Sequence, residues 1–380
     1  MRKKLIAAAV GAVYRVFSCL PEKQVIALLS RQSARPFDFR LLEEELVERF
    51  PDYKIRWVCV SSIGKLGVGT FLSQLKMVAT ARVCFVDGYV PAVSIPHRHR
   101  STCIQLWHAA GAVKKFGYQC LDTQAGRSSE DARVFRMHRG YDYIIAGMPG
   151  ALPAFEQAFD APGELIEPLG LPRLDYLVGR AYEKKRKADQ RRVREQLGIA
   201  SDDDRAIVLY APTFRKNNSD PQWLEHNVGQ LAEALKGKRA LLVVAGHPLE
   251  ADALDAQRMQ GADVAVLRGP TIEALSCADV VVSDYSAVAL EAGFAGKPVA
   301  FFVPDIDEYR QSPGLNIDPL EAFPDEAFID AAALVQALFP QDSELTYTGP
   351  AFAAFMREYA AGVSDTAVAR ITDLVSGIIS

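Results

Sequence analysis

The sequence lacks the features of several large protein classes. Its 380 residues include only six cysteines, which form neither a Cys-x-x-Cys pair nor a Cys/His group with zinc-ligand spacing. We therefore interpret the cysteines as small core residues of a protein in a reducing compartment. Lysine and arginine (43) are outnumbered by aspartate and glutamate (47), so the net charge is −4 and no strong basic field attracts nucleic acid.

The chain also has no apolar run long enough to cross a membrane. After three basic residues, an apolar run covers only residues 5–14 before Arg15 interrupts it, whereas a spanning helix needs about 20 apolar residues. Three interpretations remain open for residues 1–20. They could form a signal peptide cleaved near Val10-Gly11-Ala12, a helix lying in the membrane surface, or an amphipathic helix packed on the body. We favour the surface helix, with its basic residues at the lipid headgroups.

What the sequence does contain is a regular alternation of short apolar runs and helical stretches. "QVIALLS" (24–30) and "RVCFVDG" (82–88) predict strands, and "DFRLLEEELVERFP" (38–51) predicts a helix with Asp38 as N-cap. The same alternation resumes after residue 200 with "RAIVLYAPTFR" (205–215) and "DVVVSDYS". Alternating strands and helices are typical of parallel sheets covered by helices. We therefore predict an α/β protein with two similar lobes.

A basic stretch separates the two halves. "YEKKRKADQRRVREQLG" (182–198) is either the solvated face of a helix or a surface that leans toward anionic lipid. We predict an N-terminal lobe over residues 21–180, a linker or helix over 181–200, and a C-terminal lobe over 201–380. The final helix of the chain is able to pack back on the N-terminal lobe.

Polar residues that bind anions or move protons follow the predicted strands in both halves. His108 follows "IQLW", Thr213 and Arg215 follow "IVLYAP", and His247 follows "LLVVAG". In open parallel sheets, ligands bind beyond the carboxyl ends of the strands. We therefore expect these side chains to line a site between the lobes, where a histidine can take a proton from an attacking hydroxyl.

The stretch "VVVSDYSAVALEAGFAGK" (280–297) contains the most informative turn. A buried strand passes into a helix through Ser283, Asp284, Tyr285 and Ser286. One serine alone could be a helix N-cap worth about 1 kcal/mol, but that role leaves the acid, the phenol and the second hydroxyl unexplained. The first turn of a helix has unpaired N–H groups and a positive dipole end. The turn therefore predicts a diphosphate-binding site.

Six motifs, in order along the chain, resemble those of the CDP-glycerol glycerophosphotransferase family, whose members prime and polymerise teichoic acids. The motifs are "IQLWHAAGAVKK", "GLPRLDYL", "VLYAPTFR", "GHP", "SDYSAVALEAGFAGKPVAFFVPDIDEYR" and "GLNIDP". The resemblance extends from near Leu20 to about residue 320. It implies a GT-B type fold, in which two Rossmann-like lobes enclose the active site and the C-terminal lobe binds the nucleotide.

The resemblance also implies an activity and its partners. The enzyme would transfer glycerol phosphate from CDP-glycerol to a hydroxyl of an undecaprenyl-diphosphate-linked glycan acceptor and release CMP. It would act as a peripheral protein at the cytoplasmic face of the cell membrane, and the length of the chain favours a primase type. Hydroxyls, basic side chains and helix-end donors would hold the diphosphate, so no metal, cofactor or nucleic-acid partner is predicted.

Individual residues take roles from the same resemblance. His108 is the expected base, and His247 is expected near the diphosphate as a second catalytic group. The residues expected to bind the diphosphate or nucleotide are Thr213, Arg215, Ser283, Asp284, Tyr285 and Ser286. Contacts with the acceptor or a phosphate are assigned to Trp107, Lys114, Lys115, Glu308 and Arg310.

The chain departs from the family pattern at four places. Ala109 stands for a glycine, Ala287 for a second serine, Pro313 for an arginine, and Ala245-Gly246 precedes the His-Pro pair where a basic residue is common. These changes leave three alternatives open. The donor could be CDP-ribitol or another CDP-alditol, the enzyme could be a nucleotide-sugar glycosyltransferase, or the protein could be a non-catalytic nucleotide-binding scaffold.

Overall fold

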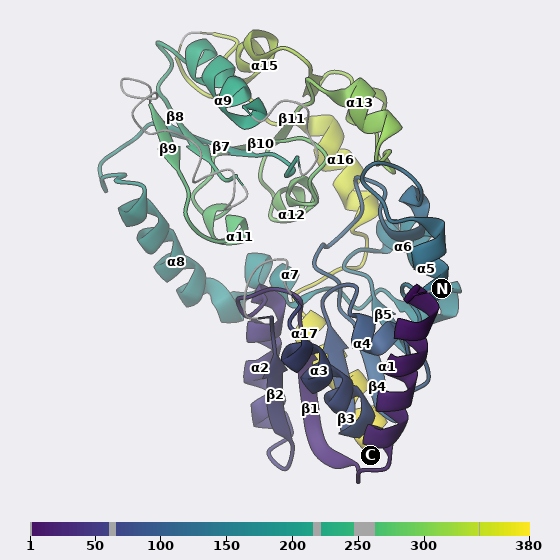
Figure 1. Cartoon of the computed structure of the whole chain (residues 1–380). Helices are drawn as coiled ribbons and strands as arrows, with labels where there is room; N and C mark the ends of the chain where they lie inside the picture. The colour runs from purple at the N-terminus through teal and green to yellow at the C-terminus, as the bar shows by residue number, and fades with distance from the viewer. Residues whose placement is uncertain (1, 61–65, 216–221, 247–262, 342) are drawn as a thin grey trace. The chain divides into compact units, whose positions relative to one another are not determined.

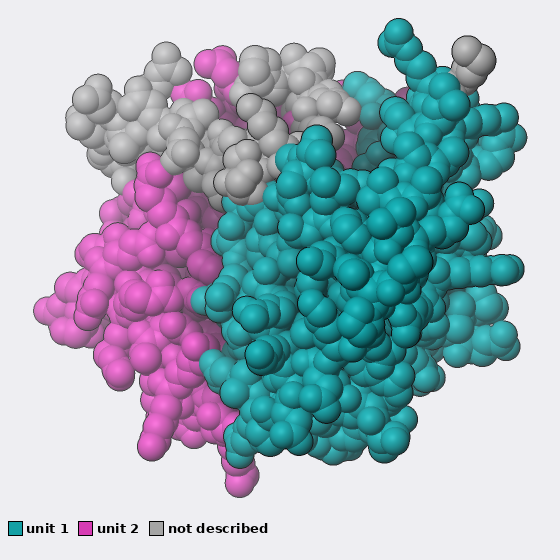
Figure 2. Space-filling view, turned by 60° about the horizontal axis from the view of Figure 1, so that its bottom comes forward, with its two compact units in different colours: residues 1–111, 115–175, 362–380 teal, residues 112–114, 176–361 magenta. Residues whose placement is uncertain are grey.

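The computed structural model describes the chain except for residues 1, 61–65, 216–221, 247–262 and 342. The chain forms two compact units, which Figure 2 shows in different colours. Unit 1 consists of Met1–Gly111, Lys115–Asp175 and Gly362–Ser380, and unit 2 consists of Ala112–Lys114 and Tyr176–Ala361. The basic segment that we predicted as a linker or helix therefore lies within unit 2.

Unit 1 is built on six parallel strands in the order β2-β1-β3-β4-β5-β6. Ile26, Leu28 and Val83 in its central strands have no exposed surface, as expected where helices cover both faces of a parallel sheet. The loops that follow β1, β3 and β4 lie at one edge of this sheet, because parallel strands end at the same edge. The strands are β1 (Lys23–Leu29), β2 (Lys54–Val58), β3 (Ala81–Val86), β4 (Thr102–Gln105), β5 (Tyr143–Ile145) and β6 (Ile166–Glu167).

Helices from both ends of the chain pack on this sheet (Figure 1). They are α1 (Arg2–Ser18), α2 (Phe37–Arg49), α3 (Val68–Thr80), α4 (Pro91–Ser94), α5 (Ser129–Val134), α6 (Leu152–Phe159), most of α7 (Pro172–Val178) and α17 (Ala367–Ile379). The last helix is held in unit 1 by Asp175, whose carboxylate accepts hydrogen bonds from the backbone N–H groups of Ala367 (2.9 Å) and Val368 (2.8 Å). Arg49 of α2 also donates to Thr372 of α17 (2.9 Å).

Unit 2 repeats the scheme with a second sheet of six parallel strands, in the order β12-β11-β10-β7-β8-β9. Its core joins Val208, Val280 and Phe302 from the strands to Leu231 and Leu334 from the covering helices. The strands are β7 (Ala206–Ala211), β8 (Ala240–Val244), β9 (Val264–Val266), β10 (Val280–Ser283), β11 (Val299–Phe302) and β12 (Ala327–Phe328). The helices are α8 (Glu183–Gln196), α9 (Trp223–Ala234), α11 (Thr271–Ala274), α12 (Val288–Phe294), α13 (Ile306–Gln311), α14 (Pro319–Ala322), α15 (Ala331–Leu338) and α16 (Pro350–Tyr359).

The N-terminal helix packs on the body and also exposes apolar side chains. Val10 and Tyr14 of α1 are buried, and α1 contacts α3 and α5. On the opposite face, Leu5 is 63% exposed and Val16 is 67% exposed. No helix in the described part of the chain is long and apolar enough to cross a membrane.

Two local predictions were wrong. Asp38 does not cap α2, because the helix begins one residue earlier and Pro36 occupies the cap position. The buried carboxylate of Asp38 instead accepts hydrogen bonds from the backbone N–H (2.8 Å) and the Nε (2.8 Å) of Arg173. The predicted strands also omitted β6 and β12, which are two-residue edge strands without an apolar run.

Candidate functional site

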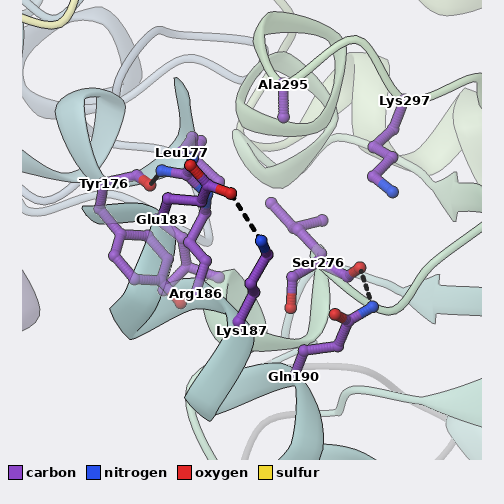
Figure 3. Close-up of a pocket in the computed structure, with 11 residues that line it drawn as sticks. Tyr176, Leu177, Glu183, Arg186, Lys187, Gln190, Ser276, Ala295 and Lys297 are labelled. Carbon is purple, nitrogen blue, oxygen red and sulfur yellow. Dashed lines mark hydrogen bonds and ion pairs between the residues drawn. The ribbon is translucent and has the colours of Figure 1, made fainter. Parts of the chain in front are cut away.

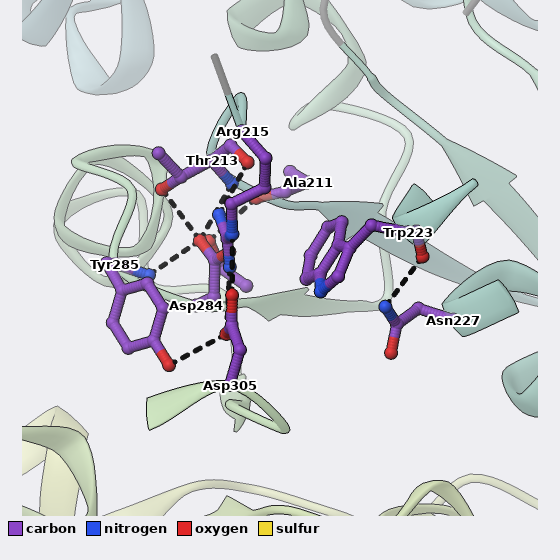
Figure 4. A network of polar contacts seen from close by, with 9 residues as sticks. Ala211, Thr213, Arg215, Trp223, Asn227, Asp284, Tyr285 and Asp305 are labelled. Carbon is purple, nitrogen blue, oxygen red and sulfur yellow. Dashed lines mark hydrogen bonds and ion pairs between the residues drawn. The ribbon is translucent and has the colours of Figure 1, made fainter. Parts of the chain in front are cut away.

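A buried network joins the carboxyl ends of β7 and β10 in unit 2 (Figure 4). Asp284, which has no exposed surface, follows β10 and accepts hydrogen bonds from the backbone N–H and the hydroxyl of Thr213, both at 2.8 Å. Ser283 donates to the backbone oxygen of Ala211 (2.8 Å). The two loops that the sequence places 71 residues apart are therefore fixed to each other by their own polar groups.

Arg215 is the cation of this network. Its side chain is 6% exposed and forms ion pairs with Asp284 (Nη2–Oδ2, 2.8 Å) and Asp305 (Nε–Oδ2, 2.7 Å). The guanidinium carbon lies 4.1 Å from the centre of the Trp223 ring and 4.6 Å from that of Tyr309. Burial disfavours the charged guanidinium and lowers the pKa of Arg215. The two carboxylates have the larger opposite effect, so the pKa is raised above its ordinary value.

Tyr285 completes the network through its phenol. Its hydroxyl donates to Oδ1 of Asp305 (3.1 Å), and its ring stacks on Tyr309 with 3.9 Å between centroids. Burial raises the pKa of Tyr285, so the phenol remains a neutral donor. The network contains one guanidinium and two carboxylates, so the charge of Arg215 is already paired within the protein. We infer that Arg215, Asp284 and Tyr285 hold the loop in shape.

Ser286 differs from its neighbours because it is half-buried, whereas Ser283, Asp284 and Tyr285 have no exposed surface. Its hydroxyl accepts a hydrogen bond from the backbone N–H of Val288 (3.3 Å) at the start of α12. The network therefore presents one hydroxyl and the first turn of a helix at the carboxyl end of β10.

In unit 1, the loop after β4 contains a turn with unusual backbone geometry. Trp107 adopts a φ of 51°, a left-handed conformation that is rare for a bulky residue. Gln105 stabilises this turn on both sides: its amide oxygen accepts from the backbone N–H of Trp107 (2.9 Å), and its amide nitrogen donates to the backbone oxygen of Gly88 (2.9 Å). The indole stacks on Phe116, with 4.8 Å between ring centroids. Such strain is found where the surrounding structure holds a functional side chain in place.

The turn places His108 against the loop that follows β3. Nδ1 of His108 lies 3.0 Å from the backbone oxygen of Asp87. A carbonyl oxygen can only accept, so in the neutral imidazole Nδ1 carries the proton and Nε2 is the nitrogen able to take one. This is the tautomer that a general base requires.

The side chain of Asp87 is buried beside this contact. Its Oδ2 accepts from the hydroxyl of Ser30 (2.8 Å) and the amide of Gln32 (3.0 Å), both of which follow β1. Burial raises the pKa of Asp87 to about 6. Asp87 thus joins three loops: its carboxyl group binds the neutral side chains after β1, and its backbone oxygen binds His108 after β4.

The remaining predicted residues have varied surroundings. Lys114 forms an antiparallel bridge with Leu315, next to a hydrogen bond from the Asn316 N–H to the Val113 oxygen (2.8 Å). The motifs "IQLWHAAGAVKK" and "GLNIDP" therefore meet in unit 2. Lys115 is half-buried in unit 1. His247 lies outside the described residues.

The two residues predicted on α13 are both on its surface. Glu308 is exposed. Arg310 forms ion pairs with Asp318 (2.7 Å) and Asp307 (3.2 Å). Asp305 and Asp307 have Asp-x-Asp spacing, but each is paired with an arginine, and the described residues contain no group of three or more metal-ligating side chains.

Unit 2 also contains a pocket of about 250 Å³, and none of the residues that line it belongs to the predicted site (Figure 3). It is lined by Arg186, Lys187 and Gln190 of α8, by Ser276, which precedes β10, and by Lys297, which precedes β11. The pocket is therefore at the amino ends of these strands, whereas the network around Asp284 is at their carboxyl ends. Ligands of open parallel sheets bind at the carboxyl ends, so we do not assign the donor to this pocket.

The sequence analysis missed Asp87, Gln105, Asp305 and Tyr309. Asp87 and Asp305 carry a signal that it could have used, because each follows a buried strand ("RVCFV" and "AFFV") at the edge where the other candidates were found. Gln105 and Tyr309 carry none, because their roles depend on contacts with loops distant in the sequence.

Comparison with known proteins places these observations in a family. The profile of the family described as CDP-Glycerol:Poly(glycerophosphate) glycerophosphotransferase matches residues 12–377. A teichoic acid ribitol-phosphate primase of Bacillus spizizenii is 26% identical, with 99% of this chain and 97% of that protein covered. A teichoic acid glycerol-phosphate primase of the same organism is 32% identical, with 69% of this chain and 66% of that protein covered.

Solved structures agree on the fold. The wall teichoic acid polymerase TagF superimposes with a TM-score of 0.75 at 19% identity, covering 100% of this chain and 97% of that chain. A structure of a TagF variant soaked with CDPG gives a TM-score of 0.74. The predicted GT-B type fold and the predicted family are confirmed: the chain belongs to the CDP-glycerol:poly(glycerophosphate) glycerophosphotransferase family, and it is a transferase of teichoic acid synthesis.

Proposed function

We propose that this protein transfers glycerol phosphate from CDP-glycerol to a hydroxyl of a lipid-linked glycan and releases CMP, as a primase. The observation that carries the proposal is the Trp107-His108 turn, which holds an imidazole in the tautomer of a base. Family membership supplies the donor class. The relatives named as primases support the proposal that the reaction is a primase step.

The chemistry follows from the residues in each unit. The acceptor hydroxyl oxygen forms a bond to the phosphorus that carries glycerol, and His108 takes the hydroxyl proton on Nε2. The bond between that phosphorus and the bridging oxygen breaks, and CMP leaves with the electron pair. Charge develops on the phosphoryl oxygens during this step. The hydroxyl of Ser286, which accepts from the Val288 N–H at the start of α12, is positioned at a strand end to donate to them.

In this proposal most of the predicted diphosphate contacts act indirectly. Asp284 and Arg215 shape the loop that carries Ser286, because their hydrogen bonds are already made within the protein. The proposal assigns the acceptor hydroxyl to His108 of unit 1 and the donor phosphates to the Ser286 loop of unit 2. It assigns no step to a metal ion.

Peripheral membrane binding is part of the same proposal, and it rests on the exposed apolar face of α1. Arg100 donates to the Ser18 oxygen (3.1 Å), and Ser101 donates to the Val78 oxygen (2.8 Å), so α1 and α3 both end beside the start of β4. Their first turns therefore lie toward the carboxyl ends of the strands, where His108 lies. At this end Leu5, Ile6 and Val68 are 63%, 53% and 75% exposed. A lipid-linked acceptor would meet the base at this end.

One observation supports CDP-ribitol as an alternative donor. The ribitol-phosphate primase matches 99% of this chain, whereas the glycerol-phosphate primase of higher identity matches 69%. CDP-ribitol is therefore the second candidate donor.

Donor competition tests the proposal and separates the alternatives. Purified protein is incubated with a soluble disaccharide-diphosphate acceptor analogue and CDP-glycerol, CDP-ribitol or a UDP-sugar, and CMP and the product mass are measured. We expect CMP release and an added glycerol phosphate with CDP-glycerol. Preference for CDP-ribitol would assign the second donor, and product from the UDP-sugar would identify a glycosyltransferase. No product with any donor would contradict the proposal and favour a scaffold.

A further inference from the structure

Two arginines, Arg31 and Arg127, lie close to the loop that supports the His108 turn. The guanidinium carbon of Arg127 lies 4.9 Å from the centre of the Tyr89 ring. Tyr89 belongs to the same loop as Asp87. Arg31 lies between Ser30 and Gln32, whose side chains both bind Asp87. In the described part of the chain, neither guanidinium forms an ion pair or a side-chain hydrogen bond.

The segment that these arginines flank is the one that holds the base. His108 contacts the backbone oxygen of Asp87, and Tyr89 donates to the Phe135 oxygen (3.4 Å) just beyond α5. The Tyr89 ring also contacts His138, whose ring contacts Trp107 (centroids 5.7 and 5.8 Å apart). A single set of contacts therefore connects Arg127, the Asp87–Tyr89 loop and the Trp107-His108 turn.

The two arginines repel each other, and the carboxylates near them have other hydrogen-bond or ion-pair partners. Partial burial lowers the pKa of Arg31, and the positive charge of Arg127 lowers it further. Two acids act on these arginines electrostatically, Asp87 on Arg31 and Asp131 on Arg127. Ser30 and Gln32 occupy Oδ2 of Asp87, and Asp131 is paired with Lys3. Elsewhere in unit 1 the pattern differs: Arg173 pairs with Asp38 and Arg49 with Asp373.

We propose that Arg31 and Arg127 bind a phosphate group of the acceptor substrate and so position its hydroxyl at His108. Guanidinium groups bind phosphate oxygens through paired N–H donors. An anion between two cations also removes the repulsion that the free protein tolerates. The acceptor phosphate has two sources, the diphosphate of the lipid linkage or a phosphodiester next to the attacking hydroxyl. This inference rests on the proposed function, because it assigns the acceptor to unit 1.

The test compares acceptors that differ only in phosphate. The variants are Arg31→Gln, Arg127→Gln and the double variant, with Arg133→Gln on the exposed surface of α5 as the matched control. KM and kcat are measured in neutral detergent with a glycan diphosphate, with a glycan carrying a terminal glycerol phosphate, and with a neutral glycan. CMP release to water, without acceptor, reports the donor site.

We expect each single variant to raise KM for one phosphate-bearing acceptor about tenfold or more, and the acceptor affected identifies the phosphate. The neutral glycan, CMP release to water and the control variant should be unchanged, and Arg31→Lys should recover part of the loss. Equal losses on all acceptors, or no loss on any, would overturn the proposal. A loss seen only with anionic vesicles would also overturn it, because it would assign the arginines to lipid headgroups.

Binding separates this inference from the proposed function. Calorimetry with glycerophosphoglycerol and with inorganic pyrophosphate is carried out on wild-type protein and the double variant, after the thermal midpoints of both have been compared. Binding that the double variant loses would support the site even if no CDP-alditol is turned over. If wild-type protein turns over CDP-glycerol but binds neither probe at millimolar concentration, the site is refuted and the proposed function stands.

Discussion

The two units each carry a buried aspartate directly after a central strand, and the two aspartates have different partners. Asp284, after β10, is bound by the guanidinium of Arg215 and by Thr213. Asp87, after β3, is bound only by the neutral donors Ser30 and Gln32 in the contacts described above. In unit 2 the cation of the loop is thus paired with carboxylates, whereas in unit 1 the guanidinium groups of Arg31 and Arg127 lie near the loop without an ion pair in the described part of the chain. The same topological position holds an ion-paired carboxylate in one unit and a carboxyl group with neutral partners in the other.

Removing the base should have the largest effect. His108→Ala is expected to lower acceptor-dependent CMP release by roughly 10²- to 10⁴-fold, because it removes the imidazole to which we assign the hydroxyl proton. The measurement is the rate at saturating donor and acceptor. His226→Ala, on α9 of unit 2, is the matched control. A rate within a few-fold of wild type would remove His108 from the mechanism.

Breaking the ion pair of unit 2 should cost more stability than removing the aspartate of unit 1. Asp284→Ala removes one of the two ion pairs of Arg215 and leaves the buried N–H and hydroxyl of Thr213 without their acceptor, and we expect a loss of about 3–5 kcal/mol in the free energy of unfolding. Asp87→Ala leaves only neutral donors without a partner, at a cost of about 1–3 kcal/mol. Urea denaturation of both variants provides the comparison. Equal losses would show that the charge of Arg215 does not distinguish the two loops.

The pH dependence of stability should sharpen the comparison. The pKa of Asp87 is about 6 in the folded protein, above the ordinary value of 3.8. Between these values the folded protein binds more protons than the unfolded chain, so the contribution of Asp87 to stability falls as the pH rises.

Asp87→Asn removes this titration. We expect its free energy of unfolding, relative to wild type, to rise by up to about 3 kcal/mol between pH 4 and pH 7. Denaturant unfolding at several pH values measures the difference, with Asp52→Asn at an exposed turn as the control. A difference that does not vary with pH would contradict the assigned burial effect.

The smallest expected effect concerns the surfaces of the two units. Leu5→Ser, Ile6→Ser and Val16→Ser together should weaken binding to anionic vesicles by at least about tenfold, because they remove exposed apolar area from α1. Ile329→Ser, at a position 61% exposed in unit 2, is the matched control. Sedimentation with vesicles measures both. Unchanged binding of the triple variant would exclude this face. Deleting residues 1–20 is a poorer test, because Val10 and Tyr14 are buried.

The sequence predicted the fold well because most strands are continuous apolar runs. "RVCFV" and "VVV" lie in strands covered by helices, and their apolar character marks them without knowledge of their neighbours. β6 and β12 escaped prediction because two-residue edge strands bury little and therefore need no such run.

The candidate site was predictable in location but not in its internal partners. The strand-end rule led to Asp284, Thr213 and Arg215, and the structure brings all three together. Their mutual pairing depends on β7 and β10 being neighbours in the sheet, which residue type and spacing do not reveal. For the same reason Asp38 was interpreted as a local cap, although its partner Arg173 is 135 residues away.

The position of the final helix has a consequence for how the protein is made. α17 belongs to unit 1, and Asp175 binds its first turn. Translation delivers every residue of unit 2 before it delivers α17. On the ribosome, unit 2 is therefore the first of the two units to have its whole sequence available. The surfaces of α2 and β3 that α17 covers remain exposed until α17 emerges.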